Sequence, residues 1–189
     1  MNRERMEEGL RAFLEGLRAD DPAFRALAPG ERERELAEGA RRVAAAFADD
    51  LLAGYAEDPA AHLVPIEIAG SAGPVVLRQV RFVSVCAHHL LPYRGEAHVG
   101  FVPGQHHVGI GSIARLVDTL ARRLTLQEQL TASIADELAR ALRPRGTIVV
   151  LEAEHFCLSV RGARKTGHRL VTVERRGEVP PDLERLVLP

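Results

Sequence analysis

Apolar residues recur at helical spacing along the first third of the chain. Between Met1 and Asp20 they fall three or four residues apart, which predicts an amphipathic helix. A second helix is expected from about Glu31 to Tyr55, ended by Glu57-Asp58-Pro59. The residues on the apolar faces of these helices are Met6, Leu10, Phe13, Leu14, Leu17, Leu36, Val43, Phe47 and Leu51. We expect both helices to provide packing or contacts between subunits.

Near Val64 the pattern changes to the alternation that is typical of strands. The segments with strand character are residues 66–68, 75–85, 96–101 and 107–110. The last two flank Pro103-Gly104, which predicts a hairpin, and residues 70–74 predict a turn. These features mark the start of a β-rich region.

Two helices and a long strand follow. Apolar stripes predict helices over residues 112–124 and 127–142, and residues 147–160 are the strongest strand signal in the chain. Residues 178–189 carry three prolines, and we expect them to form a loose tail. Strands, then two helices, then strands predict an α+β domain in which the helices cover one face of an antiparallel sheet.

The expected organisation is therefore an N-terminal helical region over residues 1–62, a catalytic domain over residues 63–177 and a tail over residues 178–189.

Composition narrows the class of protein. Of the 189 residues, 46% are hydrophobic and 27% charged, which excludes a wholly disordered or fibrous chain. Lys and Arg number 25 against 26 Asp and Glu, and this balance argues against a non-specific nucleic-acid binder. We find no apolar stretch of membrane-spanning length and no signal peptide. Two cysteines do not make a secreted disulfide scaffold, so we expect a cytoplasmic protein that binds neither membrane nor nucleic acid.

Two short segments combine both cysteines with three histidines. They are Cys86-Ala87-His88-His89 and His155-Phe156-Cys157. Residues two apart on a strand share a face, and Cys86 and His89 can converge at a turn. Two thiolates and an imidazole are good zinc ligands, and three protein ligands plus a water form a catalytic site.

In that arrangement His88 and His155 would remain free for proton transfer. Spacing alone leaves two alternatives open. One is a closed structural zinc site with His88 or His155 as fourth ligand, and the other is a pair of small buried cysteines.

Polar residues near the start of the predicted 127–142 helix could recognise a base. A carboxylate such as Glu128, which follows Gln127, can accept two hydrogen bonds from the N1–H and 2-amino groups of guanine. The alternative is a solvated first turn, which the helix dipole favours. Three arginines could bind phosphate through their planar guanidinium groups: Arg115, Arg161 and Arg164. The alternative is that they form ordinary surface ion pairs.

Several motifs, in this order, resemble the GTP cyclohydrolase I family. They are Ser84 to Pro92, Gly109 to Arg115, Arg122 to Thr131, Glu152 to Cys157 and Arg161-Gly162, with weaker similarity at Arg41 to Ala44 and Gly54-Tyr55. The resemblance spans roughly residues 78 to 173. It implies the tunnelling fold, assembled as a pentamer of dimers into a homodecamer with sites at subunit interfaces.

Matched residue by residue, the resemblance also implies roles. Cys86, His89 and Cys157 match the family's Zn²⁺ ligands, and His88 and His155 its acid–base pair. Gln127 and Glu128 match purine anchors, and Arg115 and Arg161, with Ser112, the triphosphate contacts. The implied reaction opens the guanine imidazole ring of GTP at C8, releases formate and gives 7,8-dihydroneopterin triphosphate.

The chain departs from the family pattern mainly at the phosphate contacts. Gly111-Ser112 stands where the family has Ser-Lys, which removes one expected cation. Ala87 replaces a glutamate and Gln129 an arginine, and residues 167–172 replace a run rich in Thr and Ser. One alternative is therefore a paralogue that acts on another purine nucleotide or stops at the ring-opened product. An alternative of another class is a non-catalytic, zinc-stabilised oligomer.

Overall fold

The structure of the chain is a computed structural model that describes residues 1–70 and 72–188. It comprises two units, Met1–Ala53 and Gly54–Pro189. Residues 54–62 belong to the second unit, where the Gly54 N–H donates to the Arg122 carbonyl (3.1 Å). The expected domain boundaries after residues 62 and 177 remain predictions. None of the helices formed by the described residues has the length and apolar character needed to cross a membrane.

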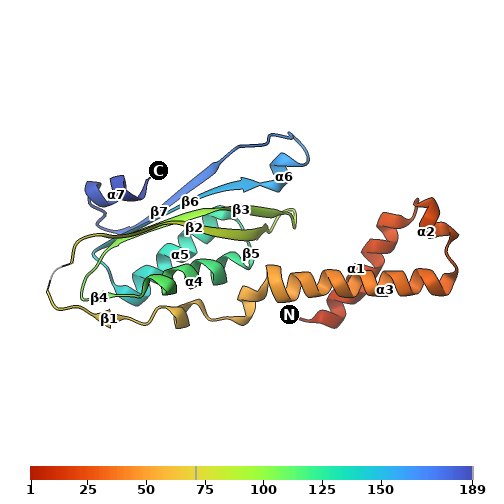
Figure 1. The fold of residues 1–189 in the computed structure, drawn as a ribbon, viewed down its shortest axis with the longest axis horizontal. Coiled ribbons are helices and arrows are strands. Elements are labelled where there is room, and N and C mark those ends of the chain that lie inside the picture. The colour runs from red at the N-terminus through yellow and green to blue at the C-terminus, as the bar shows by residue number, and fades with distance from the viewer. Residues whose placement is uncertain (71, 189) are drawn as a thin grey trace. The chain divides into compact units, whose positions relative to one another are not determined.

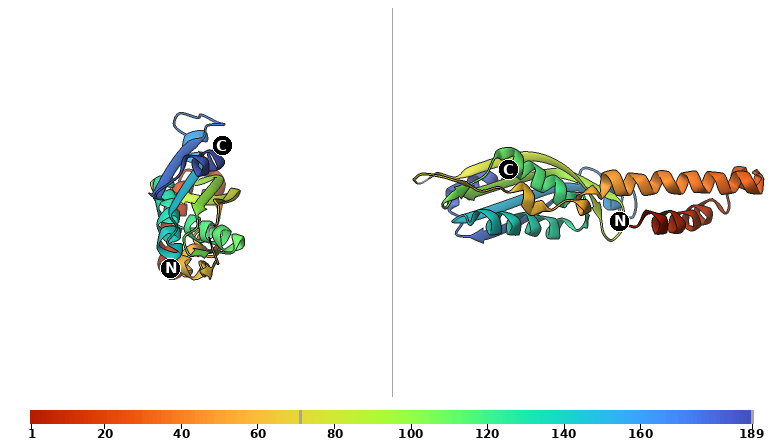
Figure 2. Two further views of the ribbon diagram at one scale, coloured as in Figure 1. Left: turned by 90° about the vertical axis from the view of Figure 1, so that its left-hand side faces the viewer. Right: turned by 90° about the horizontal axis from the view of Figure 1, so that it is seen from below.

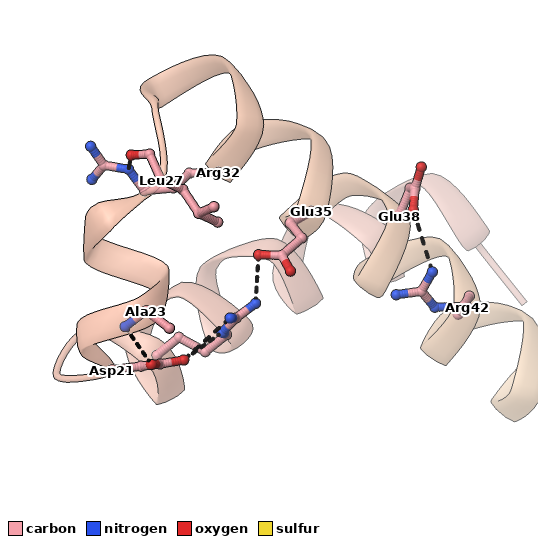
Figure 3. Close-up of polar contacts among 8 residues, drawn as sticks. Asp21, Ala23, Leu27, Arg32, Glu35, Glu38 and Arg42 are labelled. Atoms are coloured by element: carbon pink, nitrogen blue, oxygen red, sulfur yellow. Dashed lines mark hydrogen bonds and ion pairs between the residues drawn. The ribbon is translucent and has the colours of Figure 1, made fainter.

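The first unit is helical. Its elements are α1 (Arg3–Arg18), α2 (Pro22–Ala26), α3 (Pro29–Ala45) and the π-helical η1 (Ala46–Leu51). Charged pairs hold α1 to α3 and close the turn between them: Arg18 donates to both Asp21 (3.2 Å) and Glu35 (2.8 Å). Figure 3 shows this cluster together with Arg32, whose Nε donates to the Leu27 carbonyl.

The single helix expected from Glu31 to Tyr55 is wrong in its second half. The α-helix ends at Ala45, and the chain continues as η1 and then as the 3-10 helix η2 (Ala53–Ala56). The reason is tertiary: the Gly54 N–H is bonded to Arg122 of a distant segment rather than to a carbonyl of the preceding turn. A Cβ at Gly54 would lie 2.0 Å from the Thr119 carbonyl oxygen, so no other residue allows this close approach.

The second unit is built on a five-stranded sheet in the order β5-β2-β3-β6-β7. Its strands are β2 (Val75–Cys86), β3 (Pro92–Val102), β5 (Leu124–Thr125), β6 (Gly146–His155) and β7 (Leu170–Gly177). All neighbours pair antiparallel except β5, which runs parallel to β2. The register sets Ser84 opposite Tyr93 and Tyr93 opposite His155, so the carboxyl ends of β2 and β6 meet at one end of the sheet.

Two helices cover one face of this sheet, as predicted. They are α4 (Ile110–Ala121) and α5 (Gln127–Leu142), and they lie side by side beneath the strands in Figure 1 and across the near face in the right panel of Figure 2. The main core lies between these helices and the sheet. Its fully buried members include Leu116, Ile134, Leu138, Val149 and Leu151. The predicted α+β architecture, a largely antiparallel sheet with two helices on one face, is confirmed.

The predicted hairpin over Pro103-Gly104 is wrong. His106–His107 forms β4, which pairs with β1 (Ile66–Glu67) and not with β3. The end of β3 is already paired on its other side, where Val102 accepts from the Arg145 N–H (2.9 Å) and lies opposite Gly146. The turn expected over residues 70–74 includes Ser71, which lies outside the described residues.

The strand predicted over residues 147–160 ends at His155. Phe156–Ser159 forms the short helix α6, closed by the Val160 N–H donating to the Phe156 carbonyl (3.0 Å). The Ser159 hydroxyl also bonds the Glu154 carboxylate (2.9 Å), which folds the chain back on itself. His155 and Cys157 therefore do not share one strand face, and the prediction that they do, made from their spacing, is wrong.

The tail is not loose over most of its length. The unit begins near the 3-10 helix η3 (Pro59–His62) and ends with the short helix α7 (Pro181–Val187), which packs on the face of the sheet opposite α4 and α5. Leu183 and Val187 are fully buried against Ile148 and Val150. Three prolines suggested a loose segment, but two apolar side chains four residues apart complete a second, smaller core.

Replacing Leu183 with alanine should therefore destabilise the protein by about 2–5 kcal/mol, because the substitution leaves a cavity under α7. Urea unfolding at fixed protein concentration would measure this. Leu186→Ala is the matched control, since Leu186 is on the same helix but half exposed. Equal midpoints for the two variants would contradict the packing of α7.

Candidate active site

Cys86 and His89 are brought together by a tight turn at the end of β2. The Leu90 N–H donates to the Cys86 carbonyl (2.9 Å), and Leu90 itself adopts a left-handed conformation (φ 54°). The Cys86 N–H donates to the Leu91 carbonyl (2.9 Å), which closes the turn. As a result, the Cys86 Sγ lies 3.6 Å from the His89 Nδ1.

Cys157 completes a group of three ligand atoms. It lies in α6, directly after β6, and its Sγ is within 4.8 Å of the other two ligand atoms. In a tetrahedral zinc site, bonds of about 2.0–2.3 Å place ligand atoms about 3.5–3.8 Å apart. The observed spacing fits such a site with a small contraction. Cys86 is buried, Cys157 half-buried and His89 exposed, so the group opens to solvent on one side.

The electrostatics of the two thiols favour a cation between them. Burial raises the pKa of Cys157 above its usual value, and the neighbouring Cys86 raises it further. Two adjacent thiolates repel each other, and a divalent ion would remove that repulsion and favour the thiolate forms. Within the part of the chain that the structure describes, neither His88 nor His155 joins this group. The arrangement therefore offers three ligands and one open position.

His155 lies beside the group with its ring held on several sides. The Tyr93 ring stacks on it, with centroids 4.5 Å apart and planes 3° apart. Its Nε2 is 2.8 Å from the Gln127 Oε1. Burial lowers the pKa of His155 and a nearby His168 lowers it further, against an opposing effect of Glu128, so the site favours the neutral imidazole. A neutral, oriented imidazole can accept a proton.

His88 is the second histidine expected to transfer protons. It is exposed, and its ring meets that of His89 edge to face, with centroids 6.1 Å apart. It therefore lies next to the metal-ligating group without belonging to it.

The two polar residues at the start of α5 differ in exposure. The Gln127 side chain is fully buried, and its amide nitrogen donates to Leu151 O (3.0 Å), Leu170 O (2.9 Å) and Thr172 Oγ1 (3.1 Å). Glu128 is exposed in the first turn of the helix. Of these two residues, Glu128 is the one whose side chain is free to meet a ligand.

The expected phosphate contacts are not gathered at the metal-ligating group. Arg115 donates to the Ser112 hydroxyl (3.2 Å), so these two residues form one cluster on α4. Arg115 also lines a cavity of about 190 Å³ together with Glu57, His62, Asp118, Thr119 and Arg122. Ser112 is in the first turn of α4, whose far end leads to β5, so it lies roughly 13 Å along the helix axis from Ala121. Arg161 is exposed in the loop after α6, close enough to lower the pKa of Cys157.

Three residues of the site were not predicted from the sequence. They are Tyr93, Thr172 and His168, whose Nε2 accepts from the His155 N–H (3.1 Å). For Tyr93 a signal existed, because it directly follows the Ser84 to Pro92 motif that holds Cys86 and His89. For the other two, nothing in the spacing indicated that β7 and its preceding loop return to this end of the sheet.

The chain is similar to known proteins over most of its length. A sequence profile of the GTP cyclohydrolase I family matches residues 22–186. A GTP cyclohydrolase 1 of Brucella anthropi is 44% identical over 158 residues, which cover 82% of this chain and 74% of that protein. A GTP cyclohydrolase 1 of Bacillus cytotoxicus is 39% identical over 183 residues, covering 96% of this chain and 91% of that protein.

Among solved structures, an apo archaeosine synthase QueF-Like aligns with a TM-score of 0.49 and 22% identity, covering 59% of this chain and all of that one. The family assignment does not depend on that likeness. The family profile and both relatives match over most of the length of the chain. The chain belongs to the GTP cyclohydrolase I family.

Proposed function

We propose that this protein is a zinc-dependent GTP cyclohydrolase I that opens the guanine imidazole ring at C8, releases formate and forms 7,8-dihydroneopterin triphosphate. The observation that carries the proposal is the three-ligand group of Cys86, His89 and Cys157, with His155 held beside it and not in it. The relatives named GTP cyclohydrolase 1 support the same substrate.

Zn²⁺ would be held by the two thiolates and the His89 imidazole, and when bound it would lower the pKa of a coordinated water toward about 7. The chain's own residues then handle protons and position the base. Protonation of the purine N7 makes C8 electrophilic, and the exposed His88 is the side chain that can deliver that proton. His155, whose lowered pKa favours the neutral ring, can take a proton during addition of water at C8 and return it as the C8–N bond breaks.

Base recognition falls to Glu128. Its carboxylate is exposed in the first turn of α5, next in sequence to the buried Gln127 that contacts His155. A carboxylate there can accept from the N1–H and 2-amino groups of guanine together, which adenine cannot offer. This geometry favours GTP over ATP.

We propose a homodecamer with sites shared between copies. Ser112 and Arg115 lie along α4, away from the cysteine and histidine group, so they could meet a triphosphate held by another subunit together with Arg161. On α1, Phe13 and Leu17 are more than half exposed, which supports contacts between subunits. Ser112 stands where the family has a lysine. Arg164, Lys165 or Arg169 would then supply the positive charge for the triphosphate.

Glu128→Gln should raise the KM for GTP by about tenfold to a hundredfold, because one charge-assisted contact is worth about 1.5–3 kcal/mol. The kcat should change less, since the substitution keeps the proton-transfer groups. Initial rates over a range of GTP concentrations would measure both constants. Glu137→Gln on the same helix is the control, because Glu137 pairs with Arg140 away from the site. An unchanged KM would remove Glu128 from base recognition.

The test of the function is a product assay. Zinc-loaded protein is incubated separately with GTP, GDP, GMP and ATP, formate is quantified and products are identified by mass. We expect formate and a pterin triphosphate from GTP alone. Formate without a pterin, or turnover of another nucleotide, would identify a paralogue whose Gly111-Ser112 segment changed its specificity. No formate from any of them, with zinc bound, would support a non-catalytic oligomer.

A further inference from the structure

Gln127 occupies a position that the family resemblance assigns to purine binding, yet its side chain has no free hydrogen-bonding group. We propose that Gln127 is a positioning residue that fixes the ring orientation and the tautomer of His155, and that Thr172 holds Gln127 in place. This inference rests on the proposed function, because it concerns a histidine expected to transfer protons in that reaction.

The neighbours of the Gln127 amide fix its orientation. One end of this group faces the Leu151 and Leu170 carbonyl oxygens, at 3.0 and 2.9 Å. Carbonyl oxygens only accept, so the amide nitrogen must lie at that end. The assignment of the amide therefore follows from its neighbours, and the Oε1 must be the atom that faces His155.

The oriented Gln127 amide in turn fixes the tautomer of His155. The Gln127 Oε1 lies 2.8 Å from the His155 Nε2 and can only accept, so the Nε2 carries the proton. In the neutral ring the Nδ1 is then left unprotonated. It is the one nitrogen of His155 that can take a proton from, or return a proton to, a bound substrate.

Thr172 closes a ring of hydrogen bonds around Gln127. The Gln127 Nε2 has two N–H groups for three acceptors, so the Thr172 hydroxyl (3.1 Å) shares an N–H with a neighbouring carbonyl, and the Thr131 hydroxyl donates to the Gln127 backbone carbonyl (2.6 Å). The two threonine hydroxyls are 2.6 Å apart, so the Thr172 hydroxyl donates to that of Thr131. Every polar atom of the Gln127 side chain is thus used inside the protein, and the side chain is fully buried. A base cannot bind this amide without breaking bonds from β6 and β7.

Two further contacts restrict His155 itself. The Tyr93 ring stacks on the imidazole at 4.5 Å, which sets the plane of the ring, and the His155 N–H donates to the His168 Nε2 (3.1 Å), which holds the backbone. Tyr93 sets the plane of the His155 ring and Gln127 fixes its tautomer. The unprotonated Nδ1 is therefore held in one orientation. Such outer contacts typically change activity about tenfold to a hundredfold when removed.

The variant that tests this is Thr172→Val, which keeps the shape of the side chain and removes the hydroxyl that holds Gln127. We expect the kcat for formate release to fall by about tenfold. The affinity for 7-deaza-GTP, which keeps the recognition edge of guanine but has no N7 to protonate, should stay unchanged. Thr172→Ser keeps the hydroxyl and should restore most of the kcat. Thr147→Val is the control, because Thr147 is also a fully buried threonine, and its hydroxyl donates to the Gly100 carbonyl instead (2.9 Å).

A second readout needs no turnover. In the zinc-loaded wild type labelled with ¹⁵N-histidine, the His155 signals, assigned by their loss in His155→Ala, should show a protonated Nε2 and an unprotonated Nδ1 at neutral pH. Observation of the opposite tautomer would overturn the proposal. So would a tenfold weaker binding of 7-deaza-GTP to Thr172→Val, or a kcat in Thr147→Val as low as that in Thr172→Val. If the wild type releases no formate the proposed function fails, whereas the ring signals still decide the role of Gln127.

Discussion

His89→Ala should lose both bound zinc and formate release, while the adjacent His88→Ala should keep its zinc. The reason is the turn that begins at Cys86: it brings the Nδ1 of His89 to 3.6 Å from the Cys86 Sγ, whereas the ring of His88 lies outside the ligand group. Removing one of three protein ligands leaves two thiols, which form a much weaker site. Metal content by atomic spectroscopy, together with formate release, would measure both effects.

This pair of variants is well matched. Both histidines are exposed, so neither substitution leaves a cavity, and the two residues share one turn. Cys86 is a poorer choice, because it is buried in the main core and its loss would also affect folding. Full zinc content in both variants would mean that His89 is not a ligand. Zinc loss in both would point to a closed structural site that includes His88.

The second large effect is expected for His155→Ala, which should retain zinc and lower the kcat by about a hundredfold to ten-thousandfold. That range is the usual contribution of a positioned group that transfers protons. Its ring lies against Tyr93 and Gln127, and no ligand atom of His155 belongs to the group formed with Cys157. Rates under saturating GTP, with zinc measured on the same samples, would check the prediction.

His107→Ala serves as the control for His155→Ala. His107 is also half-buried, but it lies in the small β1–β4 sheet. Its replacement should leave the kcat and the zinc content unchanged. If His155→Ala lost its zinc, His155 would be a fourth ligand and the site would be closed, which would favour the non-catalytic reading. If it kept both zinc and kcat, the proton transfer would belong to another residue.

Much of the fold could be predicted from local pattern. The helix over residues 127–142 has the predicted bounds, because its apolar stripe repeats every three or four residues and Arg143 ends it in a left-handed conformation. The strand that ends at Cys86 and the two helices on one face are also confirmed. In each case the signal lies within a window of consecutive residues, where periodicity reports the buried face directly.

Where the prediction was wrong, the deciding contact came from a distant segment. The expected hairpin partner of β3 pairs with β1 instead, since β6 already occupies the end of β3 at Val102. The tail forms α7 because Leu183 and Val187 find the second face of the sheet. The strand predicted to run through Cys157 to residue 160 ends at His155, as Ser159 reaches back to Glu154.

The sequence by itself determined the chemistry available to this protein: two cysteines, the paired histidines, His155 and Glu128, in an order that identifies the family. Those residues lie in short motifs, and their donor atoms can be read from the residue types alone. Only the tertiary structure decided what Gln127 does. Its four side-chain partners, Leu151, His155, Leu170 and Thr172, lie 24 to 45 residues away in the sequence. The role of a buried amide depends on which donors and acceptors surround it, and that is settled when β6 and β7 pair beside α5.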